Sequence, residues 1–479
     1  MSSVEDRINS HMENTLSAQK QAFLQNVIPD ARSRIDKLNI AIELLVDNRK
    51  ELEEAVSEDF GHRSDEATAF SDIMPAVGAL KFARDNVRNW MKAEKRRSVF
   101  PLGLLGANSK VEFQPKGVVG LMTPWNFPIG MVFTPLAGIL GAGNRVMIKP
   151  SEFTPKTSEL TAKLLSQAFS VDEVAVFQGG PEVGAAFSKL PFDHLMFTGA
   201  TSIGRHVMRA AAENLTPVTL ELGGKSPVVI GKSASLDLVA KRVMAGKVLN
   251  AGQICLAPDY VFVPEGKQDE LIQEIKKAVS AMHPSGLLNN DDYTSVINER
   301  HYSRLNGYIE DAEKKGATVI SLAPENEDFS QQPHRKIAPT LLINVSDDMQ
   351  VMQDEIFGPI LPIKTYSDIE SVVGYINERD RPLALYYFGS DQREERSILE
   401  NTVSGGVTVN DVIFHNGQQD LPFGGTGASG IGCYHGRDGF LEFSHKKAVF
   451  HQTKIDVLQM LRPPYGKLFH SEVNRKIKR

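Results

Sequence analysis

The chain has 479 residues, which is more than one hydrophobic core normally supports, so two or three domains are expected. Its net charge of −6 argues against nucleic acid as the main partner, because phosphate binding needs a basic face. The two cysteines, Cys255 and Cys433, lie far apart and lack metal-ligand spacing. They indicate a reduced, cytoplasmic protein without a metal site rather than a disulfide scaffold.

Two segments bear on targeting. Residues Met1–Glu13 mix charges and contain no apolar run, so they do not resemble a signal peptide. Residues Val118–Gly143 contain no charged residue and are long enough to span a bilayer. Pro124, Pro128 and Pro135 interrupt this segment, so we predict a buried strand, turn and helix, and no membrane span.

The N-terminal part is predicted to be helical. Apolar residues recur at helical spacing from Ser3 to Phe60, Gly61 breaks the pattern, and a second helical region covers Glu66–Arg96. Short β-rich runs then alternate with helical segments such as Thr157–Phe169 and Ser202–Asn214. The strands predicted here are Gly117–Thr123, Arg145–Lys149, Val174–Gln178, His194–Thr198 and Val218–Leu220.

The same alternation continues to residue 413 and favours parallel sheets with crossover helices. We therefore predict an α/β protein with two doubly wound parallel-sheet domains. Residues 1–97 and 117–222 form a Rossmann-like nucleotide-binding domain, and residues 223–413 form the second domain. The strands predicted in the second domain are Val228–Ile230, Tyr260–Val263, Pro339–Ile343, Pro359–Thr365, Leu383–Phe388 and Gly406–Asn410.

Cys255 closes the segment Asn250-Ala-Gly-Gln-Ile-Cys255. An isolated cysteine is more often a small buried hydrophobic residue than a nucleophile. Gly252 permits a close approach or an unusual backbone angle just before the cysteine. A thiol at the start of a helix would also gain a stabilised thiolate.

Glu221 follows an apolar strand in Val218-Thr-Leu-Glu-Leu-Gly-Gly-Lys225. Burial would raise the pKa of this carboxyl group and suit it to general-base catalysis. The alternative is an edge charge paired with Lys225. The chain between Glu221 and Cys255 is long enough for one strand and one helix, which would bring the two side chains together.

Asn126 lies between two prolines that fix a turn. Its amide can donate to a developing oxyanion, although asparagine is also common in turns. Three further segments are weak signals alone. The glycines of Phe197–Gly204 open a helix, where amides bind phosphate. Lys149–Glu152 ends a strand, where doubly wound sheets bind ligands. Glu355–Pro359 alone indicates only a loop.

Together these segments resemble the aldehyde dehydrogenase superfamily, over most of the chain. Pro124-Trp-Asn-Phe-Pro128, Leu220-Glu-Leu-Gly-Gly-Lys225, Gly252-Gln-Ile-Cys255 and Glu355-Ile-Phe-Gly-Pro359 occur in the family's order. The later segments Leu421–Gly430 and Tyr434-His-Gly436 are similar to the class 3 branch, and within it to coniferyl aldehyde dehydrogenases.

The resemblance implies oxidation of an aldehyde to the carboxylic acid with NAD or NADP, through a thioester on Cys255 in a catalytic domain of residues 223–413. Glu221 is then the base that activates water. Asn126 and the Cys255 amide form the oxyanion hole. The implied cofactor-binding residues are Lys149 and Glu152 at the adenine ribose, Glu355 at the nicotinamide ribose, Phe357 against the nicotinamide, and Trp125, Thr198, Gly199, Ser202, Gly204 and Leu222 along the cleft.

The resemblance also sets expectations about cofactor choice and assembly. Many relatives carry a polar side chain at the position of Ala200, so Ser202 or backbone amides would replace its contact with the pyrophosphate. Glu152 favours NAD, because it would repel a 2′-phosphate, although class 3 relatives often accept both cofactors. Those relatives are usually homodimers, so residues 98–116 and 414–479 are expected to supply an oligomerisation arm and a C-terminal tail.

The substrate expected is an aromatic aldehyde such as coniferaldehyde, or a medium-chain aliphatic aldehyde. Two other functions remain as alternatives. A CoA-acylating aldehyde dehydrogenase typically lacks the base at Glu221. A non-catalytic structural protein on the same scaffold would have lost Cys255, Glu221 or Asn126.

Overall fold

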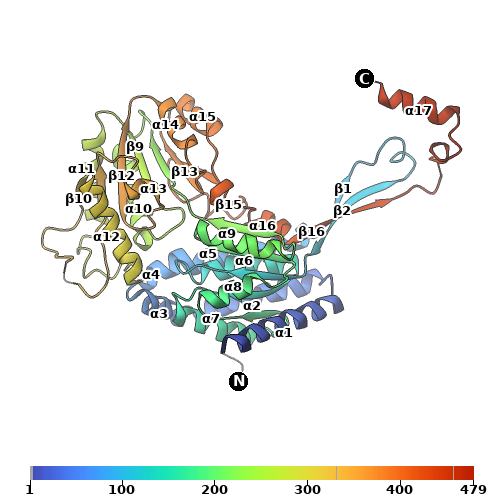
Figure 1. Cartoon of the computed structure of the whole chain (residues 1–479), viewed down its shortest axis with the longest axis horizontal. Helices are drawn as coiled ribbons and strands as arrows, with labels where there is room; N and C mark the ends of the chain where they lie inside the picture. The colour runs from blue at the N-terminus through green and yellow to red at the C-terminus, as the bar shows by residue number, and fades with distance from the viewer. Residues whose placement is uncertain (1–3, 331, 457, 479) are drawn as a thin grey trace.

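The computed structural model describes residues 4–330, 332–456 and 458–478. The predicted first domain begins with residues 1–3 and the predicted tail ends with residue 479, and these residues lie outside the described ones. Two α/β parts pack together, and a thin arm projects from one of them (Figure 1). The parts are built on a six-stranded and a seven-stranded sheet, and the arm on a three-stranded sheet. The α/β class predicted from the alternation of strands and helices is therefore confirmed.

The N-terminal part is helical up to Trp90. Gly61 ends a helix in the left-handed conformation, with φ of 76°, as its sequence position predicted. The predicted extension of the second helical region to Arg96 is wrong, because residues 94–96 form a strand that pairs with the arm. The elements are α1 (Val4–Gln25), α2 (Ala31–Asp47), α3 (Arg49–Phe60), α4 (Asp65–Thr68), the π-helix η1 (Ala69–Ile73), α5 (Met74–Trp90) and β1 (Glu94–Arg96).

The six-stranded sheet has the order β15-β7-β6-β3-β4-β5, and β3 to β7 run parallel. From β3 the chain adds β4 and β5 on one side of the sheet, and it then adds β6 and β7 on the other side. The carboxyl ends of the strands at such a switch point bind ligands. All five predicted strands occur within two residues of their predicted ends. The elements are β3 (Val118–Met122), α6 (Gly130–Ala142), β4 (Arg145–Lys149), α7 (Pro155–Ala168), β5 (Val174–Val176), α8 (Pro181–Ser188), β6 (His194–Gly199), α9 (Thr201–Ala212) and β7 (Val218–Leu222).

The seven-stranded sheet has the order β10-β11-β12-β9-β8-β13-β14 and is parallel except for β10 at its edge. The six strands predicted for this part are present, whereas β10 was not predicted. The elements are β8 (Pro227–Ile230), α10 (Leu236–Val248), the 3₁₀-helix η2 (Leu249–Gly252), β9 (Tyr260–Pro264), α11 (Gln268–Met282), α12 (Glu299–Lys314), β10 (Thr318–Ser321), β11 (Thr340–Ile343), α13 (Gln350–Gln353), β12 (Ile360–Tyr366), α14 (Ile369–Asn377), β13 (Ala384–Phe388), α15 (Gln392–Asn401) and β14 (Gly406–Val409).

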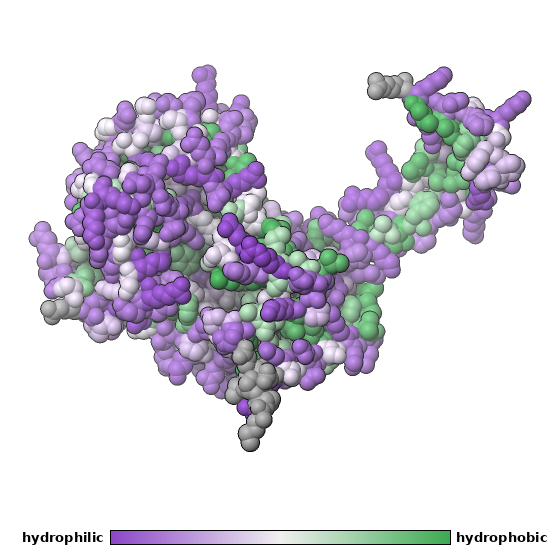
Figure 2. Space-filling model, viewed as in Figure 1, coloured by the Kyte–Doolittle hydropathy of each residue, from purple (hydrophilic) through white to green (hydrophobic). Residues whose placement is uncertain are grey.

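The arm combines β1 with β2 (Asn108–Pro115) and β16 (Ser444–His451), and it carries η4 (Gln459–Leu461) and α17 (Lys467–Ile477) beyond them. Apolar side chains are exposed along it, among them Val99, Phe100, Leu104 and Phe450 (Figure 2). None of the helices in the described ranges has both the length and the apolar character needed to cross a membrane.

Residues 414–443, which the sequence grouped with the tail, lie on the first part. Within them, β15 (Gly430–Ile431) pairs antiparallel with β7, and α16 (Gly436–Glu442) packs on α6. The short helix η3 (Gly427–Ser429) contacts β7 as well. The C-terminal segment therefore crosses beside the end of β7 before it enters the arm.

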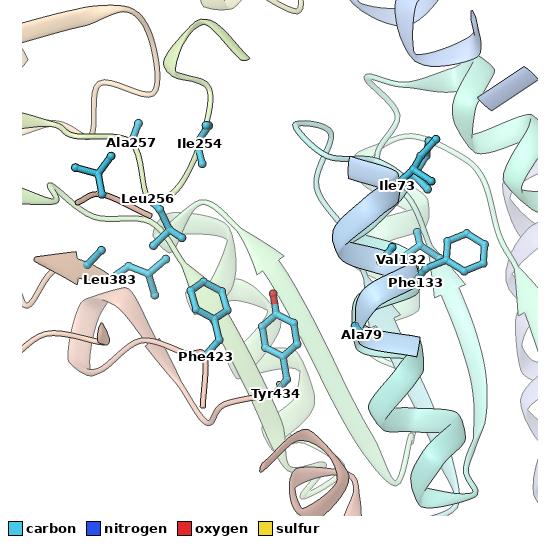
Figure 3. Packing of buried hydrophobic residues seen from close by; sticks show 14 of the residues in the cluster. Ile73, Ala79, Val132, Phe133, Ile254, Leu256, Ala257, Leu383, Phe423 and Tyr434 are labelled. Atoms are coloured by element: carbon cyan, nitrogen blue, oxygen red, sulfur yellow. The ribbon is translucent and has the colours of Figure 1, made fainter. Parts of the chain in front are cut away.

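One continuous apolar cluster joins α5 and α6 to the segment after η2. Figure 3 shows Ile73 and Phe133 on the helical side, and Leu256, Phe423 and Tyr434 on the other. Ile254 and Leu256 are both buried in this cluster. The chain that carries Cys255 is therefore anchored on both sides of the cysteine by apolar packing.

Candidate active site

A cleft of about 1030 Å³ lies between the two α/β parts. The carboxyl ends of β6 and β7 form one wall, and the loop after η2 and the loop before β12 form others. The cleft brings together predicted site residues that are widely separated in sequence: Trp125, Asn126, Thr198, Gly199, Ser202, Glu221, Leu222, Cys255, Glu355 and Phe357.

Cys255 faces this cleft from a strained turn. Asn250 and Ala251 have φ of 49° and 50°, a left-handed conformation that non-glycine residues rarely adopt. Gly252 follows with φ of 71°, and a Cβ there would overlap the carbonyl oxygen of Gly358. Both uses predicted for this glycine are therefore present. The expectation of a helix start at Cys255 is not met, because the segment there is a turn.

Buried polar contacts hold the turn in place. The Gln253 side chain is completely buried and donates to the carbonyls of Asn250 (2.9 Å) and Ser295 (3.0 Å). Its Oε1 accepts from the N–H of Ile297 at 3.0 Å. The Tyr386 hydroxyl donates to the Leu256 carbonyl at 2.6 Å. The sequence did not predict these supporting roles, since they depend on contacts with distant strands and loops.

Glu221 lies on β7 with 1% of its surface exposed. Neither carboxylate oxygen has a hydrogen-bond partner of ordinary geometry among the described residues. Burial raises the pKa of Glu221 to about 7, and the nearby Cys255 thiol and Thr198 hydroxyl oppose that rise. Burial also raises the pKa of the Cys255 thiol, and the charge of Glu221 adds to the increase.

The alternative pairing of Glu221 with Lys225 does not form. Lys225 instead makes an ion pair with Asp259 and donates to the carbonyls of Val351 (2.7 Å) and Asp354 (2.9 Å). Asp259 also accepts from the N–H of Ile356 at 2.9 Å. This network joins the ends of three segments around the cleft and binds the Lys225 amine away from Glu221.

Asn126 is buried in the turn between β3 and α6. Its Nδ2 donates to the Gln253 carbonyl at 3.1 Å, so the asparagine lies against the turn that carries Cys255. The backbone carbonyl of Asn126 accepts from the Arg63 side chain at 2.8 Å and from the Asn250 side chain at 3.1 Å. A primary amide has two N–H groups, so one remains for a ligand.

Glu355 and Phe357 form a second wall. Burial raises the pKa of Glu355 to about 8, and the charge of Asp259 contributes to that rise. The Glu355 carboxylate lies where a Cβ on Gly223 would be, and its Oε1 is buried without a hydrogen-bond partner in the described chain. The Phe357 ring meets Trp125 edge-to-face at 5.4 Å between centroids.

The helix α9 begins at the cleft, with Ala200 at its N-cap and no side-chain cap. Gly204 lies inside this helix and does not line the cleft. A Cβ on Gly204 would lie 2.7 Å from the Leu222 side chain. Lys149 and Glu152 are also outside the lining. They lie at the carboxyl end of β4, where Lys149 Nζ and Glu152 Oε2 are 3.2 Å apart.

These features fit a dinucleotide. The first backbone amides of α9 have no side-chain cap among the described residues, so they can bind a pyrophosphate. The Thr198 hydroxyl and Glu355 Oε1 have no hydrogen-bond partner in the part of the chain that the structure describes, and both residues line the same cleft. The residues at the end of β4 lie at the sheet edge where adenosine binds in doubly wound folds.

The model of the aldehyde dehydrogenase family matches residues 2–449. The chain belongs to the aldehyde dehydrogenase family. A probable coniferyl aldehyde dehydrogenase of Caulobacter vibrioides is 56% identical over 471 residues, covering 98% of this chain and 97% of that protein. Aldehyde dehydrogenase family 3 member A2 of Macaca fascicularis is 37% identical over 437 residues, covering 91% and 87%. The resemblance drawn from the sequence is confirmed.

Solved structures agree with this membership. The substrate-bound Staphylococcus aureus AldH has a TM-score of 0.90 and 34% identity, covering 97% of this chain and 99% of that one. A Mycobacterium tuberculosis aldehyde dehydrogenase complexed with NAD+ has a TM-score of 0.83 and 26% identity, covering 94% and 92%. The protein therefore has the aldehyde dehydrogenase fold. It is an enzyme that oxidises an aldehyde to a carboxylic acid with NAD or NADP.

Proposed function

We propose that Cys255 is the nucleophile, that Glu221 is the general base, and that Asn126 with the Cys255 N–H holds the oxyanion. The observation that supports these roles is the environment of Glu221, a buried carboxylate beside a thiol that faces the cleft, whose oxygens have no partner of ordinary geometry among the described residues. A carboxyl group with a pKa near neutrality matches the working range of a general base.

In the proposed reaction, the Cys255 sulfur attacks the aldehyde carbon as the thiolate, after its proton has passed to solvent. Asn126 and the Cys255 N–H donate to the carbonyl oxygen as it becomes negative. A nicotinamide held beside Phe357 would supply the hydride acceptor, and Cys255 would then carry the acyl group as a thioester. Glu221 then takes a proton from a water molecule that attacks the thioester, and the carboxylic acid leaves with Cys255 restored.

The residues proposed to hold the cofactor are those predicted from the sequence. In this proposal Glu355 binds a ribose hydroxyl, Phe357 packs against the nicotinamide face, and the start of α9 binds the pyrophosphate. We propose a preference for NAD, because Glu152 would accept a hydrogen bond from a free 2′-hydroxyl and repel a 2′-phosphate. Its ion pair with Lys149 keeps the carboxylate at the end of β4. Ser202 or backbone amides would serve where Ala200 lacks a polar group.

For the substrate, we propose an aromatic aldehyde such as coniferaldehyde. The 56% identity with the Caulobacter protein over nearly its full length supports this class over a medium-chain aliphatic aldehyde. The proposal also includes a homodimer, which the exposed apolar side chains on the arm support, and a cytoplasmic location, which suits two free cysteines.

The test mixes the purified protein with NAD or NADP and a panel of aromatic and aliphatic aldehydes, without CoA, and follows reduced nicotinamide by absorbance. We expect turnover that is fastest with aromatic aldehydes and NAD, and that is lost in Cys255→Ala. Activity only after CoA is added would favour the acylating alternative. Cofactor binding without turnover in either condition would favour a non-catalytic scaffold.

A further inference from the structure

A completely buried ion pair lies behind the turn that carries Asn126. Arg63, in the loop between α3 and α4, and Asp72, in the π-helix η1, are both 0% exposed. Their closest charged atoms, Arg63 Nη2 and Asp72 Oδ2, are 3.7 Å apart. The guanidinium carbon lies 5.1 Å from the ring centres of Phe60, at the end of α3, and of Phe127, next to Asn126.

The two residues of the pair bind the backbone at both ends of the turn that carries Asn126. Arg63 Nη1 donates to the carbonyl of Asn126 at 2.8 Å. Asp72 Oδ1 accepts from the N–H of Gly130, the first residue of α6. A Cβ on Gly130 would lie 2.9 Å from Asp72 Oδ1, so only glycine lets the carboxylate approach so closely. The five residues from Asn126 to Gly130 are thus held at each end by one member of the pair.

Stability alone does not explain this arrangement. A buried ion pair must overcome a large desolvation cost, and apolar residues of similar size are often as stable or more stable. Here the pair is also incompletely satisfied, because Arg63 Nε and Asp72 Oδ2 have no hydrogen-bond partner in the described ranges. π-Helices such as η1 are frequent at functional sites, where a local cost in stability is retained for function.

We infer that Arg63 and Asp72 are positioning residues, which fix the Asn126 turn so that its side-chain amide is aimed at the carbonyl oxygen of the aldehyde that Cys255 attacks. The inference rests on the proposed role of Asn126 as oxyanion donor. Asn126 Nδ2 already donates to Gln253 in the turn that carries Cys255. A shift of the Asn126 backbone therefore moves the donor relative to the sulfur, and an oxyanion donor acts only at hydrogen-bond distance.

The test compares kcat and KM of Arg63→Met, Asn126→Ala and the double variant. Loss of one oxyanion donor lowers the rate about 10²–10³-fold, and displacement of the same donor should cost less, so we expect Arg63→Met to lower kcat about 10–100-fold. KM for the cofactor should stay within about 2-fold. In the Asn126→Ala background, adding Arg63→Met should change kcat by less than about 2-fold, because the arginine acts through that asparagine.

A matched control is available in Arg34, another buried arginine. It binds backbone carbonyls of α6, the helix that follows the Asn126 turn. Arg34 Nη1 donates to the carbonyls of Gly141 and Ala142, at 3.0 and 2.7 Å, at the opposite end of α6. Arg34→Met should lower the melting temperature as Arg63→Met does, with kcat unchanged. Arg63→Lys, which keeps one donor for the Asn126 carbonyl, should recover part of the lost kcat.

The outcomes separate the inference from the function on which it rests. If Asn126→Ala leaves kcat unchanged, the proposed oxyanion donor is wrong. If Asn126→Ala lowers kcat but Arg63→Met behaves like Arg34→Met, or if the two losses multiply in the double variant, the positioning role is overturned. Should Arg63→Met fail to fold, Asp72→Asn replaces it, since it removes the charge and keeps an oxygen for Gly130. It should lower kcat about 3–10-fold, and only when Asn126 is present.

Discussion

Replacing Glu221 by glutamine should make the folded protein more stable and much less active. The carboxyl group ionises near pH 4.5 in an unfolded chain, whereas burial raises its pKa to about 7 in the folded protein. One pKa unit corresponds to about 1.4 kcal/mol, so the ionised carboxylate costs about 3 kcal/mol of folding stability above pH 7. Glutamine has nearly the same shape and does not ionise.

The sign of the pH dependence follows from the direction of the shift. Between about pH 4.5 and pH 7 the folded protein keeps a proton on Glu221 that the unfolded chain has released, so stability falls as pH rises through this window. The variant lacks this contribution. Its melting temperature should therefore exceed that of the native protein by a margin that grows from pH 5 to pH 7 and then stays constant.

Turnover should change in the opposite direction. General bases contribute about 10²–10⁴-fold to a rate, so steady-state kcat of Glu221→Gln should fall by that factor. The first step should survive, because removing the negative charge beside Cys255 takes away one cause of its raised pKa. Rapid mixing should therefore show a burst of about one reduced nicotinamide per site. In the native enzyme, kcat should rise with pH through about 7.

The surface substitution Glu213→Gln, at the exposed end of α9, is the control and should change neither property. Steady-state turnover that survives Glu221→Gln would refute the base assignment. A stability difference that does not vary with pH would refute the claim that the native carboxylate is buried at a cost.

Three further substitutions test the supporting structure. Gly252→Ala forces a Cβ onto the Gly358 carbonyl at a left-handed φ, so the melting temperature should fall and kcat should drop at least about ten-fold; unchanged kinetics would contradict the geometry of this turn. Lys225→Met leaves Asp259 buried without its ion-pair partner and should destabilise the protein by about 3–5 kcal/mol in urea unfolding, with Lys277→Met on the surface as control. Phe450→Asp places a charge on the apolar arm and should shift the proposed homodimer toward monomer in analytical ultracentrifugation; an unchanged mass would exclude the arm as the interface.

The strands of both sheets were predictable because they are buried on both faces and appear as short apolar runs between glycines and prolines. Arg145–Lys149 was predicted to the residue. The edge strand β10 was not predicted, since Thr318 and Ser321 at its ends are exposed and its apolar run is only two residues long. Glu94–Arg96 consists of charged residues, and its strand exists through pairing with β2 rather than through its own preferences.

The candidate site was predictable only where its residues lie in recognisable segments. Cys255 follows Gly252 closely, Glu221 precedes a pair of glycines, and Asn126 lies between two prolines. Arg63, Asp72 and Asp259 did not, because a single charged residue in a sequence normally indicates a solvated surface. Their roles arise from contacts across the fold, such as the bond from Arg63 to the Asn126 carbonyl. Only the folded chain reveals that these charges are buried.

The distribution of hydrogen bonds separates the residues that shape the site from those available to a ligand. Gln253, Lys225 and Tyr386 have their polar groups bound to backbone carbonyls or to a buried carboxylate around the cleft. Glu221 and Thr198, in contrast, have buried oxygens without partners in the described chain. Unpartnered buried polar atoms cost stability unless a ligand or water satisfies them. Part of this cost falls on Glu221 and Thr198, which line the cleft, so bound substrate and cofactor should raise the melting temperature of the native enzyme more than that of Glu221→Gln.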